Sequence, residues 1–250
     1  MKSFAQASSK ACGFQRQSLW SGVRGLKAPD MKKEGERMTE LILVRHCQAE
    51  GNLKRFFQGR TDSDITELGA KQIERAGEYL KDQNIDVLYV SPLLRAKKTA
   101  EGINRYHQKE MRFCDELVEI DAGKWEGVPL SEVEKIYPEE YDHWKNNKAL
   151  FHAPGGESMA DVYARVSKAL DRIIKDNQGK TVCLVSHGCA IMNMLCYLHG
   201  YPVEDIGKIT LGTNLAISVI HFDEEMRPTV IKENDAAYLQ KLNSRSTGIV

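Results

Sequence analysis

The sequence predicts an α/β protein, a three-layer α/β/α sandwich with a mostly parallel central sheet and a small helical lid. The first observation is that short apolar, strand-like runs alternate with segments of helical periodicity. This pattern is typical of parallel strands joined by right-handed helical crossovers. The second observation is that two of these runs end in histidine, at Arg45-His46 and at His187-Gly188. Open α/β sheets bind ligands at the carboxyl ends of their strands, so both histidines are candidates for a functional site.

The composition sets the class of protein. Of the 250 residues, 42% are hydrophobic and 28% are charged, which is ordinary for a soluble globular protein. No apolar run reaches the roughly 18 residues that indicate a membrane span. Residues 1–29 hold five basic residues and no acid, so the remainder carries a net charge of −5 and gives no reason to expect nucleic-acid binding. The six cysteines form no CxxC pair, so we expect a cytoplasmic protein without disulfides. We also expect the protein to be a monomer or a homodimer.

The chain divides into three parts. Residues 1–37 lack periodicity and are rich in Ser, Gly, Lys and Arg, a composition that resembles a transit peptide. Two plainer interpretations, which we favour, are a disordered extension and a non-native segment upstream of a true start at Met31 or Met38. A single folded domain is expected over 38–242, and residues 243–250 are expected to form a loose tail.

In the first half of this domain, the strand Glu40–Arg45 is followed by a loop over Cys47–Ile65. Thr66 is a plausible N-cap for a helix. The next expected elements are, in order, a helix over Glu67–Lys81, a strand over Asp86–Val90, and a helix over Leu93–Tyr106 that begins after Ser91-Pro92.

In the second half, residues of about 122–156 are expected to form a lid that excludes water and selects the substrate. Its aromatic residues Tyr137, Tyr141 and Trp144 belong either to a core or to a substrate cleft. Apolar residues then recur every three or four positions from Met159 to Ile173 and predict an amphipathic helix. The remaining expected elements are an edge strand over Met111–Leu117, a helical segment over 130–147, a strand over Val182–Ser186, a helix over Gly188–Leu198, and two final strands over Leu215–Phe222 and Thr229–Lys232.

Arg45 and His46 together suggest phosphoryl chemistry. An imidazole nitrogen can attack phosphorus, and a guanidinium can hold phosphoryl oxygens bidentately. The plainer alternative is that both residues cap a strand at the surface. A second strand that ends in histidine, His187, makes that alternative less attractive. Arg95 lies in the first turn of its predicted helix, where free backbone N–H groups also favour an anion; elsewhere on a helix it would be a solvated or salt-bridged arginine. The N–H groups from Gly188 onward could face a phosphoryl group in the same way.

Other polar residues near these motifs leave alternatives open. The amides of Asn52 and Gln58 could donate to phosphate oxygens or could be solvated loop residues. A proton donor to a leaving alcohol could be any of four carboxylates, Glu116, Glu119, Asp121 and Glu126. Cys47 and Cys189 each lie within two residues of a candidate histidine, and their oxidation or alkylation could block the site.

Four motifs, "LVRHCQAEGN", "SPLLRAKKTA", "VEIDAGKWEG" and "VSHG", resemble in order and spacing those of the histidine phosphatase superfamily. The resemblance covers roughly Met38 to Leu239. It implies a phosphohistidine mechanism without metal or cofactor, because arginine and histidine supply the positive field. It also implies the roles: His46 as nucleophile, Glu119 as general acid, Arg45, Arg95 and His187 as groups that stabilise the transferring oxygens, and Asn52, Gln58 and Gly188 as parts of the phosphate pocket.

Within this family the sequence is more similar to phosphatases than to mutases. It has Glu119-Ile-Asp-Ala-Gly where a glycolytic mutase carries an "ERHYG"-like element, and "ENDAAYL" resembles the branch of α-ribazole and broad-specificity phosphatases. We therefore expect a phosphomonoester hydrolase for a small phosphorylated metabolite. The alternatives are a phosphoglycerate mutase-type transfer and a non-catalytic binding protein of the same fold.

Overall fold

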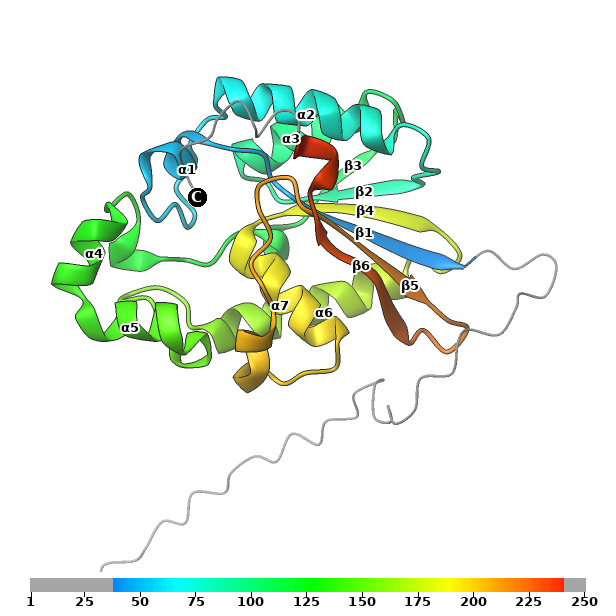
Figure 1. The fold of residues 1–250 in the computed structure, drawn as a ribbon. Helices are drawn as coiled ribbons and strands as arrows, with labels where there is room; N and C mark the ends of the chain where they lie inside the picture. Colours follow the sequence, from blue (N-terminus) through cyan, green and yellow to red (C-terminus); the bar gives the residue numbers. More distant parts are fainter. Residues whose placement is uncertain (1–37, 241–250) are drawn as a thin grey trace, which may run out of the picture. The chain divides into compact units, whose positions relative to one another are not determined.

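The computed structural model describes residues 38–240, and their centre is a six-stranded mixed sheet (Figure 1). The strands are β1 (Thr39–Arg45), β2 (Val87–Val90), β3 (Met111–Phe113), β4 (Thr181–Ser186), β5 (Ile217–Phe222) and β6 (Pro228–Asp235). They lie in the order β3-β2-β4-β1-β5-β6. The first four in this order are parallel, whereas β5 runs antiparallel to both β1 and β6. The predicted mostly parallel sheet is therefore confirmed.

The central strands β1 and β4 pair in a register that sets the position of both histidines. Every residue of β4 is buried, as expected for a strand covered by helices on both faces. Arg45 pairs with Ser186 at the carboxyl end of the two parallel strands. His46 and His187 are the next residues of each strand, so they leave the sheet side by side.

The helices complete the three layers, with α2 and α3 on one face of the sheet and α6 and α7 on the other (Figure 1). The α-helices are α1 (Glu50–Lys54), α2 (Glu67–Leu80), α3 (Leu94–Asn104), α4 (Leu130–Ile136), α5 (Pro138–Asn146), α6 (Met159–Lys175) and α7 (Gly188–Leu198). Short 3₁₀ turns are η1 (Asp115–Leu117), η2 (Gly123–Trp125), η3 (Lys148–Leu150), η4 (Val203–Lys208) and η5 (Ala237–Leu239). Among the described residues, no helix is long and apolar enough to cross a membrane.

Local sequence explains where the long helices begin. The hydroxyl of Thr66, the predicted N-cap of α2, accepts a hydrogen bond from the Gly69 N–H at 2.9 Å. Ser158 and Asp161 form a reciprocal capping box at the start of α6. Such caps satisfy N–H groups that have no partner within the helix.

Several boundaries differ from the sequence-based expectation. The predicted edge strand ends at Phe113 rather than at 117, because the chain turns into η1 once it passes the end of β2. The helical segment 130–147 is two helices, broken at Tyr137, since the residue before a proline disfavours helical geometry. The short helix α1 lies inside the expected loop. Strand β5 begins at Ile217 rather than at Leu215, whose φ of 56° is outside the range of a β-strand. The predicted extension (1–37) and tail (243–250) lie outside the described residues.

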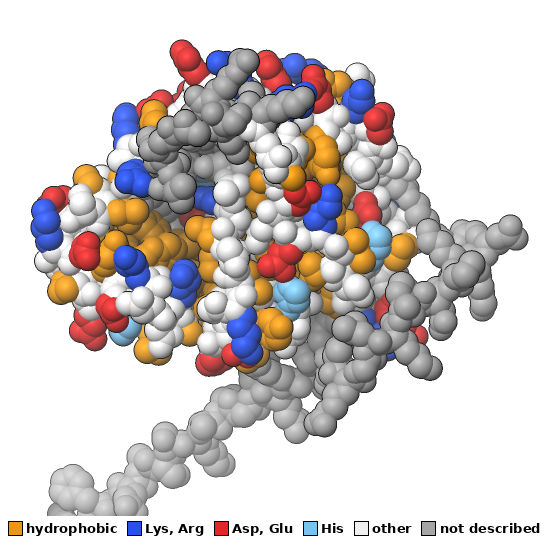
Figure 2. Space-filling model, viewed as in Figure 1, with side chains coloured by type: hydrophobic (Ala, Val, Ile, Leu, Met, Phe, Trp, Pro, Cys, Tyr) orange, Lys and Arg blue, Asp and Glu red, His pale blue; other side chains and the backbone are white. Residues whose placement is uncertain are grey.

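The segment 122–156 is built from η2, α4, α5 and η3, and its aromatic side chains pack on one another. Trp125 is fully buried, and its ring centroid lies 4.9 Å from that of Phe151 and 5.5 Å from that of Phe57. Trp144 contacts the same two phenylalanines at 4.9 and 5.2 Å. Figure 2 shows hydrophobic side chains gathered beside α4 and α5. Of the two alternatives for Trp144, this packing favours the core.

Candidate active site

The imidazoles of His46 and His187 form the centre of the candidate site. Their ring centroids are 5.1 Å apart, and the two side chains are 2% and 0% exposed. They are 141 positions apart in the sequence and meet because β1 and β4 pair in parallel. The structure thus brings together the two strand-end histidines that the sequence singled out.

Hydrogen bonds define the protonation of His46. Its Nδ1 lies 2.6 Å from the carbonyl oxygen of Cys47, which can only accept a hydrogen bond. Nδ1 therefore carries the proton when the ring is neutral, and the lone pair is on Nε2. In His187, Nε2 is 2.7 Å from the hydroxyl of Ser91, a group that can donate as well as accept. Its Nδ1 is buried and has no hydrogen-bond partner within the described part of the chain.

Two guanidinium groups lie close to this pair of rings. Arg45 donates from Nη1 to the Gly212 carbonyl. Arg95, fully buried in the first turn of α3, donates to the carbonyls of Thr61 at 2.9 Å and Gly59 at 2.7 Å. The Nε atoms of both arginines are buried without a partner among the described residues. Because an unsatisfied buried donor costs roughly 1–3 kcal/mol, these N–H groups suit an anionic ligand with several acceptor oxygens.

Burial and, after it, the neighbouring cations keep both imidazoles neutral. Burial lowers the pKa of His46 well below its ordinary value of 6.5, and the cations Arg95 and Arg45 lower it further. The pKa of His187 is lowered for the same reasons, burial first and then Arg95, His46 and Arg45. Neighbouring cations disfavour an imidazolium, so His46 is held in the form that can act as a nucleophile.

Glu119 belongs to the same buried cluster. Its carboxylate accepts hydrogen bonds from the N–H groups of Cys189 at 3.1 Å and Ala190 at 3.2 Å, in the first turn of α7. Backbone N–H groups in the first turn of a helix have no partner within the helix. Glu119 therefore occupies the N–H groups of Cys189 and Ala190. Of the three N–H groups that begin α7, only that of Gly188 is left to bind a phosphoryl group, so the sequence-based expectation for this turn is reduced to that one donor.

The other three carboxylates of the motif serve different contacts. Glu116 pairs with Arg172 at 2.9 Å, which lowers the pKa of Glu116 to about 2. Asp121 lies 3.4 Å from the guanidinium of Arg60. Glu126 accepts a hydrogen bond from the Arg60 backbone N–H at 2.7 Å. The structure thus adds a physical difference between Glu119, which the resemblance to the family singled out, and its three neighbours.

Gly188 allows the close approach of Arg45. A Cβ atom at position 188 would lie 3.5 Å from the Arg45 Nε and 3.0 Å from a methyl carbon of Leu211. A side chain larger than hydrogen would therefore press on Leu211 and fill the space beside the guanidinium.

The two predicted loop amides also have structural contacts. Asn52 lies in α1, and its side-chain oxygen accepts hydrogen bonds from the Ala49 N–H at 3.0 Å and the Asn214 amide at 3.4 Å. The side-chain oxygen of Gln58 accepts from the Ser63 hydroxyl at 2.6 Å. Each amide then has its NH₂ group as the donor that a phosphate would need.

Sequence reasoning missed several residues that hold the site in place. The amide of Asn214 donates to the carbonyls of His46 and Cys47, both at 3.1 Å. Ser91 contacts His187, and it follows β2 directly, so the rule that ligands bind at strand ends could have found it. Asn214 carries no such signal, because it lies in a loop far from any motif.

The cysteines beside the histidines are buried. Burial raises the pKa of Cys47 to about 11, and the pKa of Cys189 is raised by burial and by Glu119. Thiols of high pKa are weak nucleophiles and oxidise slowly. Both thiols are therefore expected to react slowly, and a block of the site by their oxidation or alkylation stays a prediction.

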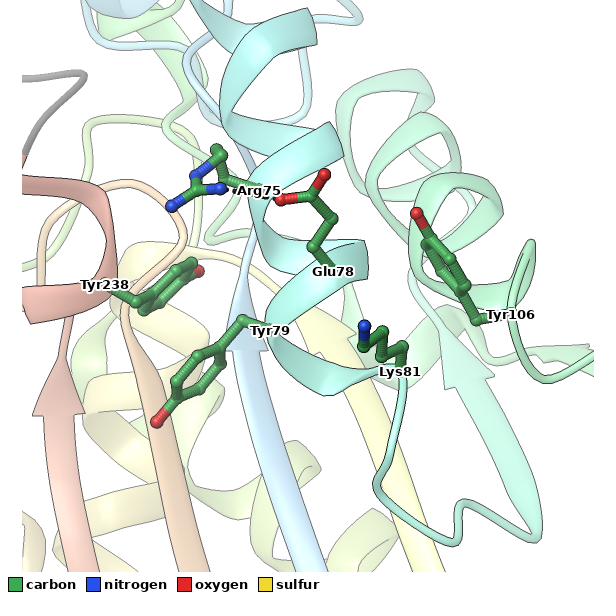
Figure 3. Close-up of a pocket in the computed structure, with 6 residues that line it drawn as sticks. All are labelled: Arg75, Glu78, Tyr79, Lys81, Tyr106 and Tyr238. Carbon is green, nitrogen blue, oxygen red and sulfur yellow. Dashed lines mark hydrogen bonds and ion pairs between the residues drawn. The ribbon is translucent and has the colours of Figure 1, made fainter.

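A surface hollow elsewhere on the domain does not belong to the site. It lies beside α2 (Figure 3), and none of its lining residues is a predicted site residue. They are Arg75, Glu78, Tyr79, Lys81, Tyr106 and Tyr238. Among the described residues, no group of three or more His, Cys, Asp and Glu side chains is arranged to hold a metal ion.

Comparison with known proteins places this geometry in a family. Residues 41–236 match the model of the histidine phosphatase superfamily, branch 1. Phosphoserine phosphatase 1 of Hydrogenobacter thermophilus is 36% identical over 202 residues, which cover 81% of this chain and 95% of that protein. YhfR of Bacillus stearothermophilus superposes with a TM-score of 0.76 at 27% identity, over 80% of this chain and 99% of that one.

The α-ribazole phosphatase of Shigella flexneri superposes with a TM-score of 0.71 over 78% of this chain and 96% of that one. At 23% identity this likeness shows a shared fold. The family match covers most of the chain and includes every predicted site residue from Arg45 to Gly188. The chain belongs to branch 1 of the histidine phosphatase superfamily and is a phosphomonoester hydrolase.

Proposed function

We propose that the chain hydrolyses a small phosphorylated metabolite through a phosphohistidine formed on His46. The main support is the buried pair of neutral imidazoles, His46 and His187. Two guanidinium groups flank this pair, and the Nε–H donor of each has no partner among the described residues. Nε2 of His46 attacks phosphorus, and the bond between phosphorus and the leaving oxygen breaks. Arg45, Arg95 and His187 stabilise the charge on the transferring oxygens, which supplies most of the acceleration in phosphoryl transfer.

Glu119 is proposed to move the protons in both half-reactions. It donates a proton to the departing alkoxide when the phosphohistidine forms. As carboxylate it then takes a proton from water, whose oxygen attacks phosphorus and releases His46 with inorganic phosphate. Its hydrogen bonds to the N–H groups of Cys189 and Ala190, just after His187 in the chain, bring the Glu119 carboxyl group to the site and support this assignment. The NH₂ groups of Asn52 and Gln58 and the backbone at Gly188 are proposed to add hydrogen bonds to the phosphoryl group.

We propose that residues 122–156 act as the lid, because their aromatic core forms a compact unit anchored on Phe57. The first substrate to test is phosphoserine, since a relative with 36% identity is a phosphoserine phosphatase. Free thiols at five buried cysteines support a reducing compartment such as the cytoplasm. A monomeric or homodimeric state without nucleic acid stays a prediction.

The experiment is hydrolysis of a phosphomonoester panel, headed by phosphoserine, in the presence of EDTA. Wild type is compared with His46→Ala and with His199→Ala, a control that removes a surface histidine paired with Glu233 at 2.6 Å. We expect the wild type and the control to release phosphate. The His46→Ala protein is expected to keep less than about 1% of this activity, since covalent catalysis has no substitute nucleophile.

The covalent intermediate gives a second readout. If the reaction with ³²P-labelled substrate is quenched rapidly under non-acidic conditions, the wild-type protein should retain covalently bound label. Treatment of the labelled protein with acid should release this label. Retention of more than a few per cent of activity by folded His46→Ala would contradict the assignment of the nucleophile. Isomerisation of 3-phosphoglycerate without net release of phosphate would favour the mutase alternative instead.

A further inference from the structure

The loop that carries Glu119 has little regular structure of its own. It lies between η1 and η2, and residues 118–122 belong to no helix or strand. A proton donor must nevertheless be held within hydrogen-bond reach of the leaving oxygen. The contacts of this loop show what holds it.

Arg165, on α6, donates all five of its guanidinium N–H groups to this loop and to one carboxylate. Nη1 donates to the carbonyls of Glu116 at 2.8 Å and Val118 at 2.9 Å, and Nη2 donates to the carbonyl of Glu119 itself at 3.1 Å. Nε and Nη2 also bind the two carboxylate oxygens of Glu157 at 2.9 and 3.1 Å. No other side chain type presents five donors in one rigid plane.

Glu157 extends this arrangement to the other end of the loop. Its Oε2 accepts a hydrogen bond from the Asp121 N–H at 2.9 Å, so the loop is held on both sides of Glu119. Burial disfavours the carboxylate, but the hydrogen bonds from Arg165 and Asp121 outweigh burial and lower the pKa of Glu157. The Arg165 and Glu157 side chains are only 16% and 18% exposed, where a paired bidentate contact is stronger than at the surface.

Glu157 also connects this loop to the arginine site. Its Oε1 lies 3.4 Å from the guanidinium of Arg60. Arg60 lies between Gly59 and Thr61, whose carbonyls hold Arg95. The same ion pair therefore touches the loop of the proposed acid and the turn that positions a phosphate-binding arginine.

We propose that the Arg165–Glu157 pair positions Glu119 for proton transfer to the leaving oxygen. The inference rests on the proposed role of Glu119 as general acid. The guanidinium of Arg165 acts through the loop and through Glu157, to which all its hydrogen bonds described above are made, so it is a positioning residue. Its loss should matter most where the leaving group needs a proton, and little where the leaving group departs readily as an anion.

The test uses two aryl phosphates of similar shape, phenyl phosphate and 2,4-dinitrophenyl phosphate. The measured quantity is kcat/KM, which reports the steps up to formation of the phosphoenzyme. For Arg165→Lys we expect a loss of about 30-fold or more on phenyl phosphate, within the range that general acid catalysis contributes. On dinitrophenyl phosphate the loss should stay below about threefold. Glu157→Gln should show the same selectivity and serves as the second variant if Arg165→Lys does not fold.

A matched control lies on the same helix. Arg172 binds the Glu116 side chain at 2.9 Å and is half exposed, but it makes no contact with the backbone of residues 118–121 among the described hydrogen bonds. Arg172→Lys should leave both kcat/KM values unchanged. In a Glu119→Gln background, Arg165→Lys should cause no further loss on phenyl phosphate.

The outcomes separate this inference from the proposed function. Equal losses on both substrates, or a selective loss that persists in the Glu119→Gln background, would overturn the positioning role of Arg165. If Glu119→Gln alone shows no selectivity between the two esters, the assignment of Glu119 as general acid fails instead. Selective loss in Arg165→Lys that vanishes without Glu119 supports both.

Discussion

The two buried histidines should make the stability of the fold depend on pH between 7 and 5.5. Their pKa values lie well below 6.5 in the folded chain, because of burial and of the cations Arg95 and Arg45. In the unfolded chain each returns to about 6.5. The unfolded state therefore binds more protons as the pH falls through 6.5, and the free energy of unfolding falls with it.

The magnitude follows from the unfolded pKa alone, as long as both rings stay neutral in the fold. From pH 7 to 5.5, an unfolded histidine with a pKa of about 6.5 goes from roughly a quarter to nine-tenths protonated. Integrated over this interval, each histidine contributes a loss of about 1.3 kcal/mol, and His46 and His187 together about 2.5 kcal/mol. Carboxyl groups contribute little, because they titrate mainly below pH 5.5.

The assay is urea unfolding at several pH values in a buffer without phosphate, since an anion bound at the site would stabilise the folded state. His46→Asn and His187→Asn should each reduce the difference in free energy between pH 7 and 5.5 by about 1.3 kcal/mol. A core variant such as Ile220→Val, at a fully buried position, should lower stability at every pH and leave this difference unchanged. If the histidine variants show the full wild-type difference, the two rings are not the source of the pH dependence.

Two further predictions concern single contacts. Asn214→Ala removes the donor to the carbonyls of His46 and Cys47, so we expect thermal unfolding experiments to show a free energy of unfolding lower by about 1–3 kcal/mol. Asn214→Asp should be less stable still, because its carboxylate would face the two carbonyl oxygens. Equal stability of the wild type and the two variants would contradict this prediction. Ser158→Ala removes the capping hydroxyl that binds the Asp161 N–H at 3.2 Å and should cost about 1 kcal/mol in urea unfolding, with kcat/KM unchanged.

Several features of the fold follow from local sequence. The apolar run of β4 predicted a buried strand, which begins one residue before the expected Val182. The periodicity of α6 predicted an amphipathic helix, which begins at the expected Met159 and ends two residues after Ile173. Thr66 was correctly expected to cap α2. These features depend on residues close in the chain, where the alternation of side chains and the hydrogen bonds of a cap are set locally.

The site depended on contacts between distant residues. Sequence placed His46 and His187 each at the end of a strand, but their 5.1 Å separation exists because Arg45 pairs with Ser186 across β1 and β4. The resemblance to the family singled out Glu119 among the four carboxylates, and the structure adds the physical reason, its contact with the first turn of α7.

Other contacts around the candidate site had no sequence signal at all. Asn214 holds the turn after β1 from a loop 168 positions away, and Arg165 holds the Glu119 loop from a helix 46 positions away. A polar residue in a loop or on a helix looks like a solvated side chain until its partners are known. Local residue patterns were enough to predict most helices and strands and the polar groups at their ends. Tertiary structure decided which of those groups meet, because register and packing bring residues together without any pattern in their spacing.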